Sequence, residues 1–178
     1  MTNASTGPMR LDYNDARDQI RSGDLLAVRS THGGFAAITR WVTRSPYTHT
    51  AIALRLCGRL MMVETRGLAG IVPVSQMLDK DFDVVACPVA TADVLKSAMD
   101  IMGKPVSYDL LDLLRIAARL RLGYHAPDQD DDSRVCSALS AEIYRRAGWQ
   151  AANLPGIPAP CEVVAAAGPV VIEVREGG

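Results

Sequence analysis

Residues 131–149, with the sequence DDSRVCSALSAEIYRRAGW, predict a helix whose beginning and end are both marked. Ser133 or Asp132 is suited to cap the N-terminus, because a short polar side chain there accepts a hydrogen bond from a free backbone N–H. Gly148 is suited to the left-handed turn that ends a helix. The rest of the chain is interpreted outward from this helix.

The predicted helix combines a buried face with a candidate nucleophile. Val135, Leu139 and Ile143 recur at helical spacing, so we expect them to face the core. Cys136 lies in the first turn, where unpaired backbone N–H groups and the helix dipole favour negative charge. A thiol in such a place can have a pKa lowered from roughly 8.5 to between about 3.5 and 7.5, and the thiolate is the nucleophile. Cys136 is therefore the first candidate for chemistry.

A structural interpretation of Cys136 stands beside the catalytic one. A free cysteine is among the most buried residue types and commonly serves as a small hydrophobic core residue. Carboxylates nearby in sequence also raise a thiol's pKa unless they point into solvent. Position alone leaves both interpretations open, and a base elsewhere in the chain is needed to decide. The nearby acidic residues are Asp128, Asp130, Asp131 and Asp132.

The composition fits a single domain without a nucleic-acid-binding surface. The 178 residues are 48% hydrophobic and 22% charged, with a net charge of -1. Nucleic-acid binding needs a clustered basic surface, which this balance argues against. No apolar run approaches the roughly eighteen residues of a membrane span, and residues 1–8 are polar, without the apolar core of a signal peptide. We therefore expect a cytoplasmic protein with no integral membrane segment.

The cysteine pattern indicates reduced thiols rather than a metal site or disulfides. The four cysteines form no CxxC pair and have no metal-ligand spacing. We expect neither a metal nor another cofactor. The four are Cys57, Cys87, Cys136 and Cys161.

Hydrophobic periodicity and turn residues predict one α+β domain over residues 11–178, preceded by a disordered tail over residues 1–10. The helix over residues 108–120 is apolar almost all round, so we expect it to be buried. Residues 124–132 form an acidic loop that we expect to be exposed. Strands are predicted over residues 23–29, 47–56, 60–64, 82–89 and 169–174, and the other helices over residues 13–20, 35–44, 91–102 and from Pro160.

A cysteine nucleophile needs a base, and three histidines are available. His32 and His125 lie in predicted loops, where an exposed surface role is favoured. His49 begins a predicted strand, in which alternation places it with Ala51 and Ala53 on one face. These small neighbours leave room for a substrate and another helix. A satisfied histidine at the rim of the core remains the alternative.

Glu64 is the candidate that would orient His49. A third group should fix the tautomer of a catalytic imidazole. In a hairpin that turns near Cys57-Gly58, positions close to His49 pair with positions around Glu64. Cross-strand neighbours have Cβ atoms about 4.5–5.5 Å apart, so a carboxylate there could accept a hydrogen bond from the ring. The alternative is an exposed glutamate at the end of a strand.

Five segments, in this order, resemble the circularly permuted NlpC-type branch of the papain-like cysteine hydrolases, the YiiX-like group. In this branch the histidine strand precedes the cysteine helix, and the resemblance spans residues 23–165. The resemblance implies a papain-like fold in which an antiparallel sheet packs against the cysteine helix. The segments are Gly23-Asp24-Leu25-Leu26, Ser45-Pro46-Tyr47-Thr48-His49-Thr50-Ala51-Ile52, Val63-Glu64-Thr65-Arg66-Gly67, Tyr108-Asp109-Leu110-Leu111 and Cys136-Ser137-Ala138-Leu139.

The resemblance also implies roles for particular residues. Cys136 would be the nucleophile, His49 the general base and Glu64 the orienting residue. Tyr108 matches an aromatic position that lines the site, and we also expect Tyr47 to contact substrate. The implied reaction is acyl transfer through a thiol acyl-enzyme.

Three functions are compatible with these residues. The first is an amidase or peptidase acting on peptide-like substrates such as cell-wall stem peptides, either in the cytoplasm or encoded by a phage. The second is hydrolysis or transfer of a lipid or thioester acyl group, because permuted relatives include acyltransferases that handle lipids. The third is an inactive binding domain of the same fold. The sequence does not indicate an oligomeric state.

Overall fold

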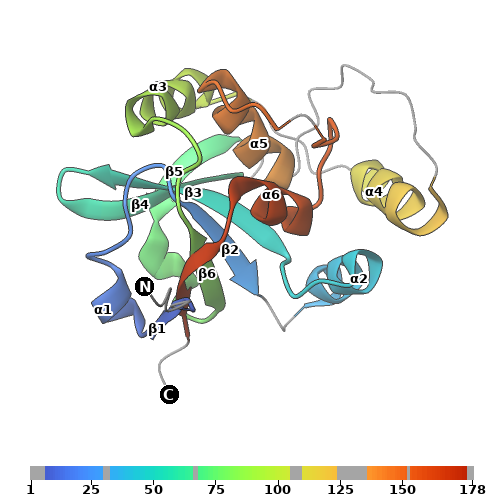
Figure 1. The fold of residues 1–178 in the computed structure, drawn as a ribbon, viewed down its shortest axis with the longest axis horizontal. Helices are drawn as coiled ribbons and strands as arrows, with labels where there is room; N and C mark the ends of the chain where they lie inside the picture. The colour runs from blue at the N-terminus through green and yellow to red at the C-terminus, as the bar shows by residue number, and fades with distance from the viewer. Residues whose placement is uncertain are drawn as a thin grey trace, which may run out of the picture.

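A seven-stranded sheet forms the centre of the computed structural model, which describes residues 7–29, 33–65, 68–104, 110–123, 136–151 and 153–175 (Figure 1). The strands are β1 (Met9–Leu11), β2 (Leu25–Arg29), β3 (His49–Leu56), β4 (Arg59–Thr65), β5 (Ala69–Pro73), β6 (Asp81–Val85) and β7 (Val170–Val174). Their order across the sheet is β1-β7-β6-β2-β3-β4-β5. The β1–β7 pair is parallel and the other neighbouring pairs are antiparallel.

Helices pack on both faces of this sheet (Figure 1). Within the described residues they are α1 (Tyr13–Ala16), α2 (Gly34–Thr43), α3 (Thr91–Ile101), α4 (Leu110–Leu122), α5 (Cys136–Arg146) and α6 (Pro160–Ala167), with a short 3₁₀ helix η1 (Val74–Met77). Helices α3, α5 and α6 bury their apolar residues against one face, and α1 and η1 lie against the other. The α+β class and the mostly antiparallel sheet packed on the Cys136 helix are therefore confirmed.

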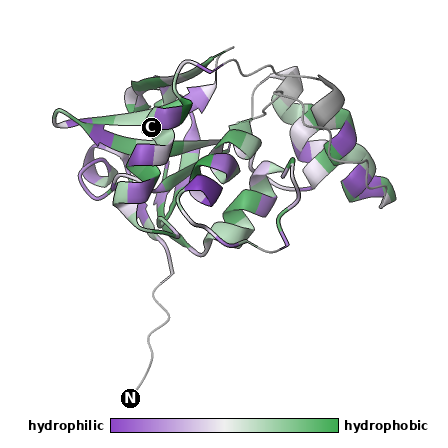
Figure 2. Cartoon of the chain, turned by 90° about the horizontal axis from the view of Figure 1, so that it is seen from above, coloured by the Kyte–Doolittle hydropathy of each residue, from purple (hydrophilic) through white to green (hydrophobic). Residues whose placement is uncertain are grey.

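Helices α2 and α4 lie side by side at one end of the molecule, away from the sheet (Figures 1 and 2). Their inner faces meet α5, because Val42 of α2, Ile116 of α4 and Ala138 of α5 share one buried cluster. The prediction that residues 108–120 are buried is wrong at Leu114, whose side chain is 56% exposed. Within the described residues, Ile116 packs with residues of α2, of α5 and of the segment 157–161, and Leu114 is not part of that cluster.

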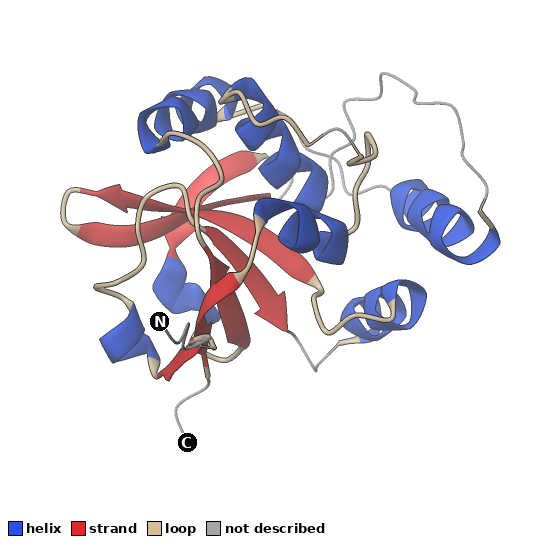
Figure 3. Ribbon diagram, viewed as in Figure 1, coloured by secondary structure: helices blue, strands red, loops and turns tan. Residues whose placement is uncertain are grey.

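The two faces of the central strands form two separate cores, as the alternating pattern of β3 predicts. Ile52 and Leu54 pack with Leu139 and Ile143 of α5, on the face that α3, α5 and α6 cover. Ala51 and Ala53 belong to the opposite core, with residues of α1 and η1. Figure 3 shows this layering of helices and strands. Burying each aliphatic side chain contributes about 1.5–3 kcal/mol, which accounts for the buried face of α5.

The β3–β4 hairpin turns through Cys57 and Gly58, as predicted. Leu56 pairs with Arg59, so the loop has two residues. Cys57 has a φ of 49° and Gly58 a φ of 75°. Positive φ at both central positions is the requirement of a type I′ turn, whose twist matches that of the flanking strands.

The predicted end of the cysteine helix is also confirmed. Gly148 has a φ of 92°, and its N–H donates to the carbonyl of Arg145. The N–H of Trp149 donates to the carbonyl of Tyr144, which completes the hydrogen-bond pattern of a Schellman motif. Leu139 and Ile143 are buried, as expected. Asp132, Ser133 and Val135 lie outside the described residues.

The predicted N-terminal tail differs from the structure at its end. Met9 and Arg10, which the prediction placed in the tail, belong to β1 and pair with Ile172 and Glu173 of β7. A strand of three residues has too little hydrophobic alternation for the sequence to reveal it. Residues 1–6 lie outside the described residues.

Candidate active site

Cys136 is the first residue of α5, and its side chain is buried. The whole beginning of the helix is anchored in the protein. The Ser137 hydroxyl donates to the carbonyl of Pro158 over 2.7 Å, and Leu139 lies in the main core. The thiol is therefore held where the helix dipole favours an anion. Burial alone is equally compatible with a structural cysteine, so the residues around Cys136 are needed to distinguish a structural from a catalytic role.

His49 is the first residue of β3 and lies at an end of the sheet, paired with Val28 of β2. Alternation places His49 on the face of Ala51 and Ala53, which packs against α1 and η1, whereas α5 covers the opposite face. The apolar residues of α5 require Ile52 and Leu54 as partners, whereas His49 shares its face with Ala51. The ring nevertheless interacts with Cys136 at the beginning of α5.

The imidazole of His49 contacts both Cys136 and Glu64. Its Nε2 atom lies 3.8 Å from Oε2 of Glu64. Among the described residues Nε2 has no hydrogen-bond partner, and the His49 side chain also forms a hydrogen bond with Cys136. The His49 side chain is 24% exposed and that of Glu64 is buried. In enzymes without substrate, catalytic hydrogen bonds are often longer than in the reacting complex, and the 3.8 Å separation fits that pattern.

The charge state of His49 responds to this arrangement. Burial lowers the pKa of His49, and the positive charge of Lys80 acts in the same direction. The charge interaction and hydrogen bond with Cys136, together with the charge of Glu64, outweigh these effects and raise the pKa above its ordinary value. The contacts with Cys136 and Glu64 therefore favour the protonated imidazole more than an isolated histidine would, and this form stabilises a neighbouring thiolate.

The structure gives the register of Glu64 relative to His49. Ile52 pairs with Val63, so by extension Glu64 lies opposite Ala51, two residues from His49, within the predicted region of pairing. The shift of two residues keeps Glu64 on the same face as His49, because side chains alternate with a period of two. The two residues are diagonal neighbours, with an expected separation of about 7–8 Å that long side chains can bridge. The shift therefore leaves the contact in place.

Two hydroxyl groups that the sequence analysis missed join the cysteine helix to the histidine strand. Ser140 donates to the carbonyl of Cys136 over 3.1 Å, and its Oγ lies 3.1 Å from Oγ1 of Thr50. Both hydroxyl groups are buried. Ser140 is one helical turn after Cys136 and Thr50 follows His49, so this spacing was the available signal. The pair sets the beginning of α5 against the beginning of β3.

The structure places Tyr47 in a buried ionic network rather than in contact with Cys136. Its hydroxyl donates to Oδ2 of Asp83 over 2.7 Å. Asp83 is fully buried and also accepts hydrogen bonds from Arg29 and Arg175. Burial, the hydrogen bond to Asp83 and that carboxylate's charge raise the pKa of Tyr47 to about 12. The Tyr47 hydroxyl is therefore committed to the network that precedes the histidine strand, and its contact with substrate stays a prediction.

The remaining candidates divide into two groups. Tyr108, His32 and His125 lie outside the described residues. Burial raises the pKa of Cys87 and of Cys161, with a further contribution from the charge of Asp24 for Cys87 and of Glu162 for Cys161. These two thiols therefore stay protonated at neutral pH, and the structure gives neither of them a histidine partner among the described residues.

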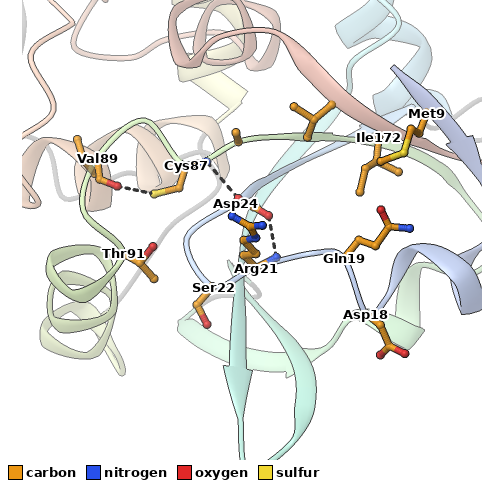
Figure 4. A pocket seen from close by; sticks show the side chains of 12 residues that line it. Met9, Asp18, Gln19, Arg21, Ser22, Asp24, Cys87, Val89, Thr91 and Ile172 are labelled. Atoms are coloured by element: carbon orange, nitrogen blue, oxygen red, sulfur yellow. Dashed lines mark hydrogen bonds between the residues drawn. The ribbon is translucent and has the colours of Figure 1, made fainter. Parts of the chain in front are cut away.

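A cavity of about 540 Å³ lies at the end of β2 away from His49 (Figure 4). Asp24 and Cys87 are among its lining residues, and Asp24 accepts hydrogen bonds from the backbone N–H groups of Arg21 and Cys87. Its carboxylate thus ties the turn before β2 to the end of β6.

Searches for a metal site and a membrane span cover only the described part of the chain. No three His, Cys, Asp or Glu side chains come together there in a way that could hold a metal ion. No helix there is both long enough and apolar enough to cross a bilayer.

No protein-family model matches the sequence, and no curated protein matches it. Among solved structures, the chain is similar to the crystal structure of metalloprotein YiiX from Escherichia coli O157:H7 (DUF1105). The sequence identity is 18% and the TM-score is 0.57, over 75% of this chain and 69% of that chain. At this identity the likeness extends to the fold, and the chain has a YiiX-like fold.

Proposed function

We propose that this chain is a thiol hydrolase of the permuted papain-like type, with Cys136 as nucleophile, His49 as general base and Glu64 as orienting residue. The observation that carries the proposal is the position of the His49 ring, which hydrogen-bonds to Cys136 and lies 3.8 Å from Glu64. A nucleophile, a base and a third group that orients the base are the features of an acyl-transfer site.

The reaction begins with transfer of the Cys136 proton to His49. The thiolate then attacks a carbonyl carbon, and the imidazolium returns the proton to the leaving amine. A water molecule, deprotonated by His49, releases the acyl group and regenerates the thiol. Glu64 stabilises the imidazolium in each half of the cycle.

The beginning of α5 supports stabilisation of the oxyanion. The backbone N–H of Cys136 lies at the beginning of α5, where the helix dipole favours negative charge. Such a donor, aimed at the developing negative charge, is typically worth about 2.7–4 kcal/mol of barrier. The bridge between Ser140 and Thr50 holds this turn against the strand that carries His49.

The proposed substrate is an amide in a peptide-like molecule. A lipid or thioester acyl group is the second candidate, and a binding domain without turnover is the third. Assaying a cell-wall stem peptide beside a long-chain ester, with Cys136→Ala as the control, separates the first two. Loss of turnover in Cys136→Ala is expected, and turnover that survives this substitution excludes Cys136 as the nucleophile.

The proposal is tested directly by iodoacetamide alkylation of each cysteine as a function of pH, measured by mass spectrometry. We expect Cys136 to react rapidly below pH 7 and His49→Ala to lose this reactivity. Cys87 and Cys161 serve as internal controls, because burial raises the pKa of both. If Cys136 reacts no faster than these two in the wild type, the paired site does not exist and the binding-domain function replaces the hydrolase.

A further inference from the structure

The cavity at the end of β2 away from His49, here called the Asp24 cavity, is not used by the proposed chemistry (Figure 4). Its volume of about 540 Å³ lies within the range of about 300–1,000 Å³ that is typical of small-molecule sites. Its wall is built from β1, the segment before β2, the segment between β6 and α3, and β7. The wall includes Met9, Arg21, Asp24, Cys87, Val89 and Ile172.

Asp24 gives this wall a buried negative charge. The residue is 7% exposed, and its Oδ2 and Oδ1 each accept one hydrogen bond, from the backbone N–H groups of Arg21 and Cys87 respectively. Burial raises the pKa of Asp24, and these two hydrogen bonds and the charge of Arg21 offset only part of this effect. A carboxylate oxygen has two lone pairs, so each oxygen retains capacity for a second donor. A positively charged group of a ligand would supply the partner that buried charges normally have.

Arg21 gives the same wall a positive charge. Its side chain is exposed and forms no ion pair or hydrogen bond within the described part of the chain. Its charge acts on the Asp24 carboxylate, so the two groups lie near each other although they form no ion pair. Asp18, the other charged residue among the described lining residues, lies 3.7 Å from the guanidinium of Arg17. The cavity therefore presents two opposite charges that a bound molecule can bridge.

Apolar side chains flank these two charges. Figure 4 shows Met9 and Ile172 toward one end of the cavity and Val89 toward the other, with Asp24 and Arg21 between them. Ile172 is buried, whereas Met9 is 49% exposed. Small-molecule sites typically combine an apolar wall with a few polar groups that fix the orientation of the ligand. This composition indicates a ligand that has an apolar part as well as charged groups.

We propose that the Asp24 cavity binds a free α-amino acid with an apolar side chain. The ammonium group donates to the Asp24 carboxylate, the carboxylate accepts hydrogen bonds from the Arg21 guanidinium, and the side chain packs toward Met9 and Ile172. A zwitterion matches both charges of the wall, whereas a singly charged ligand leaves one of them without a partner. The binding does not depend on the hydrolase chemistry, so a protein without turnover would bind the same amino acid.

Alkylation of Cys87 reports whether the cavity is occupied, because Cys87 is one of its lining residues. The full-length protein is treated with iodoacetamide at about pH 9, where thiols ionise, with and without L-leucine, and each cysteine is quantified by mass spectrometry. We expect leucine, above its dissociation constant, to slow the alkylation of Cys87 at least about threefold. Cys161 is the matched control, because burial also raises its pKa and it does not line this cavity, so its rate should not change.

Isothermal titration calorimetry at neutral pH identifies the ligand groups that bind. Leucinamide lacks the carboxylate and N-acetylleucine lacks the ammonium group, while both keep the side chain of leucine. Each should bind at least about tenfold more weakly than leucine, because each loses one charge-assisted contact. Glycine should also bind more weakly, because it has no apolar side chain. Failure of leucine to bind and to protect Cys87, or equal binding by leucine and either analogue, overturns the proposal.

Arg21→Gln tests the positive side of the cavity without disturbing the buried carboxylate. Its side chain is exposed, so we expect the variant to fold as the wild type does and to bind leucine at least about tenfold more weakly. The matched control is Arg17→Gln, which removes an exposed arginine outside the cavity and should leave the affinity for leucine unchanged. Equal affinity of the two variants for leucine overturns the proposal.

Discussion

Replacing Ser140 by alanine should weaken both the fold and the reactivity of Cys136, because this hydroxyl joins the two elements that carry the candidate nucleophile and base. Ser140 Oγ is 3.1 Å from the carbonyl oxygen of Cys136 and 3.1 Å from Oγ1 of Thr50, and both hydroxyl groups are buried. Its removal leaves the Thr50 hydroxyl without this partner. An unsatisfied buried polar group lowers the free energy of unfolding by about 1–3 kcal/mol. The better helix propensity of alanine offsets a few tenths of a kcal/mol of this loss.

Thr50→Val tests the same contact from the strand. Valine keeps the shape of threonine and leaves Ser140 hydrogen-bonded to the Cys136 carbonyl. We therefore expect Thr50→Val to lower the free energy of unfolding by about 0.5–1.5 kcal/mol, less than Ser140→Ala does. Because the two side chains form one hydrogen bond, the double variant should lose less than the sum of the single variants. We expect a coupling free energy of about 1 kcal/mol from urea unfolding of the four proteins.

Alkylation of Cys136 at pH 6 then distinguishes alignment from stability alone. Ser140→Ala should slow it by at least about threefold, the effect of roughly 0.65 kcal/mol on a rate. Ile172→Val provides the control, since it loses about 0.5–1.5 kcal/mol in the opposite core and should leave the rate unchanged. Single-variant losses that add within about 0.3 kcal/mol would show that the hydroxyl groups do not interact. Equal alkylation rates in Ser140→Ala and Ile172→Val would refute the alignment argument.

Three further perturbations test the surroundings of the site. Asp83→Asn should lower the free energy of unfolding in urea by about 1–3 kcal/mol, because it removes a fully buried carboxylate that pairs with Arg29 and Arg175 and leaves Glu173 as their counter-charge, and an unchanged free energy contradicts this network. The raised pKa of His49 means that its contribution to the free energy of unfolding is complete below pH 6.5 and is lost as the pH rises through the raised value. The stability difference between wild type and His49→Gln should therefore shrink from pH 6 to pH 9, and a constant difference argues against the ionic contacts. Gly23→Ala should lower the free energy of unfolding by about 1–3 kcal/mol, because Gly23 has a φ of 91° and an added Cβ would lie 2.8 Å from Sγ of Cys87. Thermal unfolding measures this loss, and a melting temperature equal to that of the wild type would exclude the strain.

Local sequence signals predicted the turns and helix ends near the candidate site more reliably than they predicted which side chains are buried. The hairpin turn at Cys57-Gly58 was predictable because glycine tolerates positive φ. The end of α5 was predictable from Gly148 for the same reason. In contrast, Leu114 was expected to be buried and is exposed, since a hydrophobic pattern does not reveal whether a neighbour is available.

Some residues of the candidate site could also be identified from the sequence, and others could not. Cys136 and His49 were identifiable as candidate site residues because each begins a helix or strand. A polar side chain at that position does not have to follow the hydrophobic periodicity of the element. The roles of Thr50 and Ser140 were not, because serine and threonine at buried positions have no distinctive pattern. Asp83 was noted as a charge inside a strand, but its partners Arg29 and Arg175 come from two other segments of the chain.

The sequence by itself determined where the cysteine helix ends and where the β3–β4 hairpin turns, because helix periodicity, strand alternation and turn chemistry are local properties. The tertiary structure decided the strand register and the packing partners. It placed Glu64 diagonal to His49, turned the face of Thr50 toward α5 and left the outer sides of α2 and α4 exposed. These outcomes depend on how separate segments share buried surface, which no window of the sequence contains.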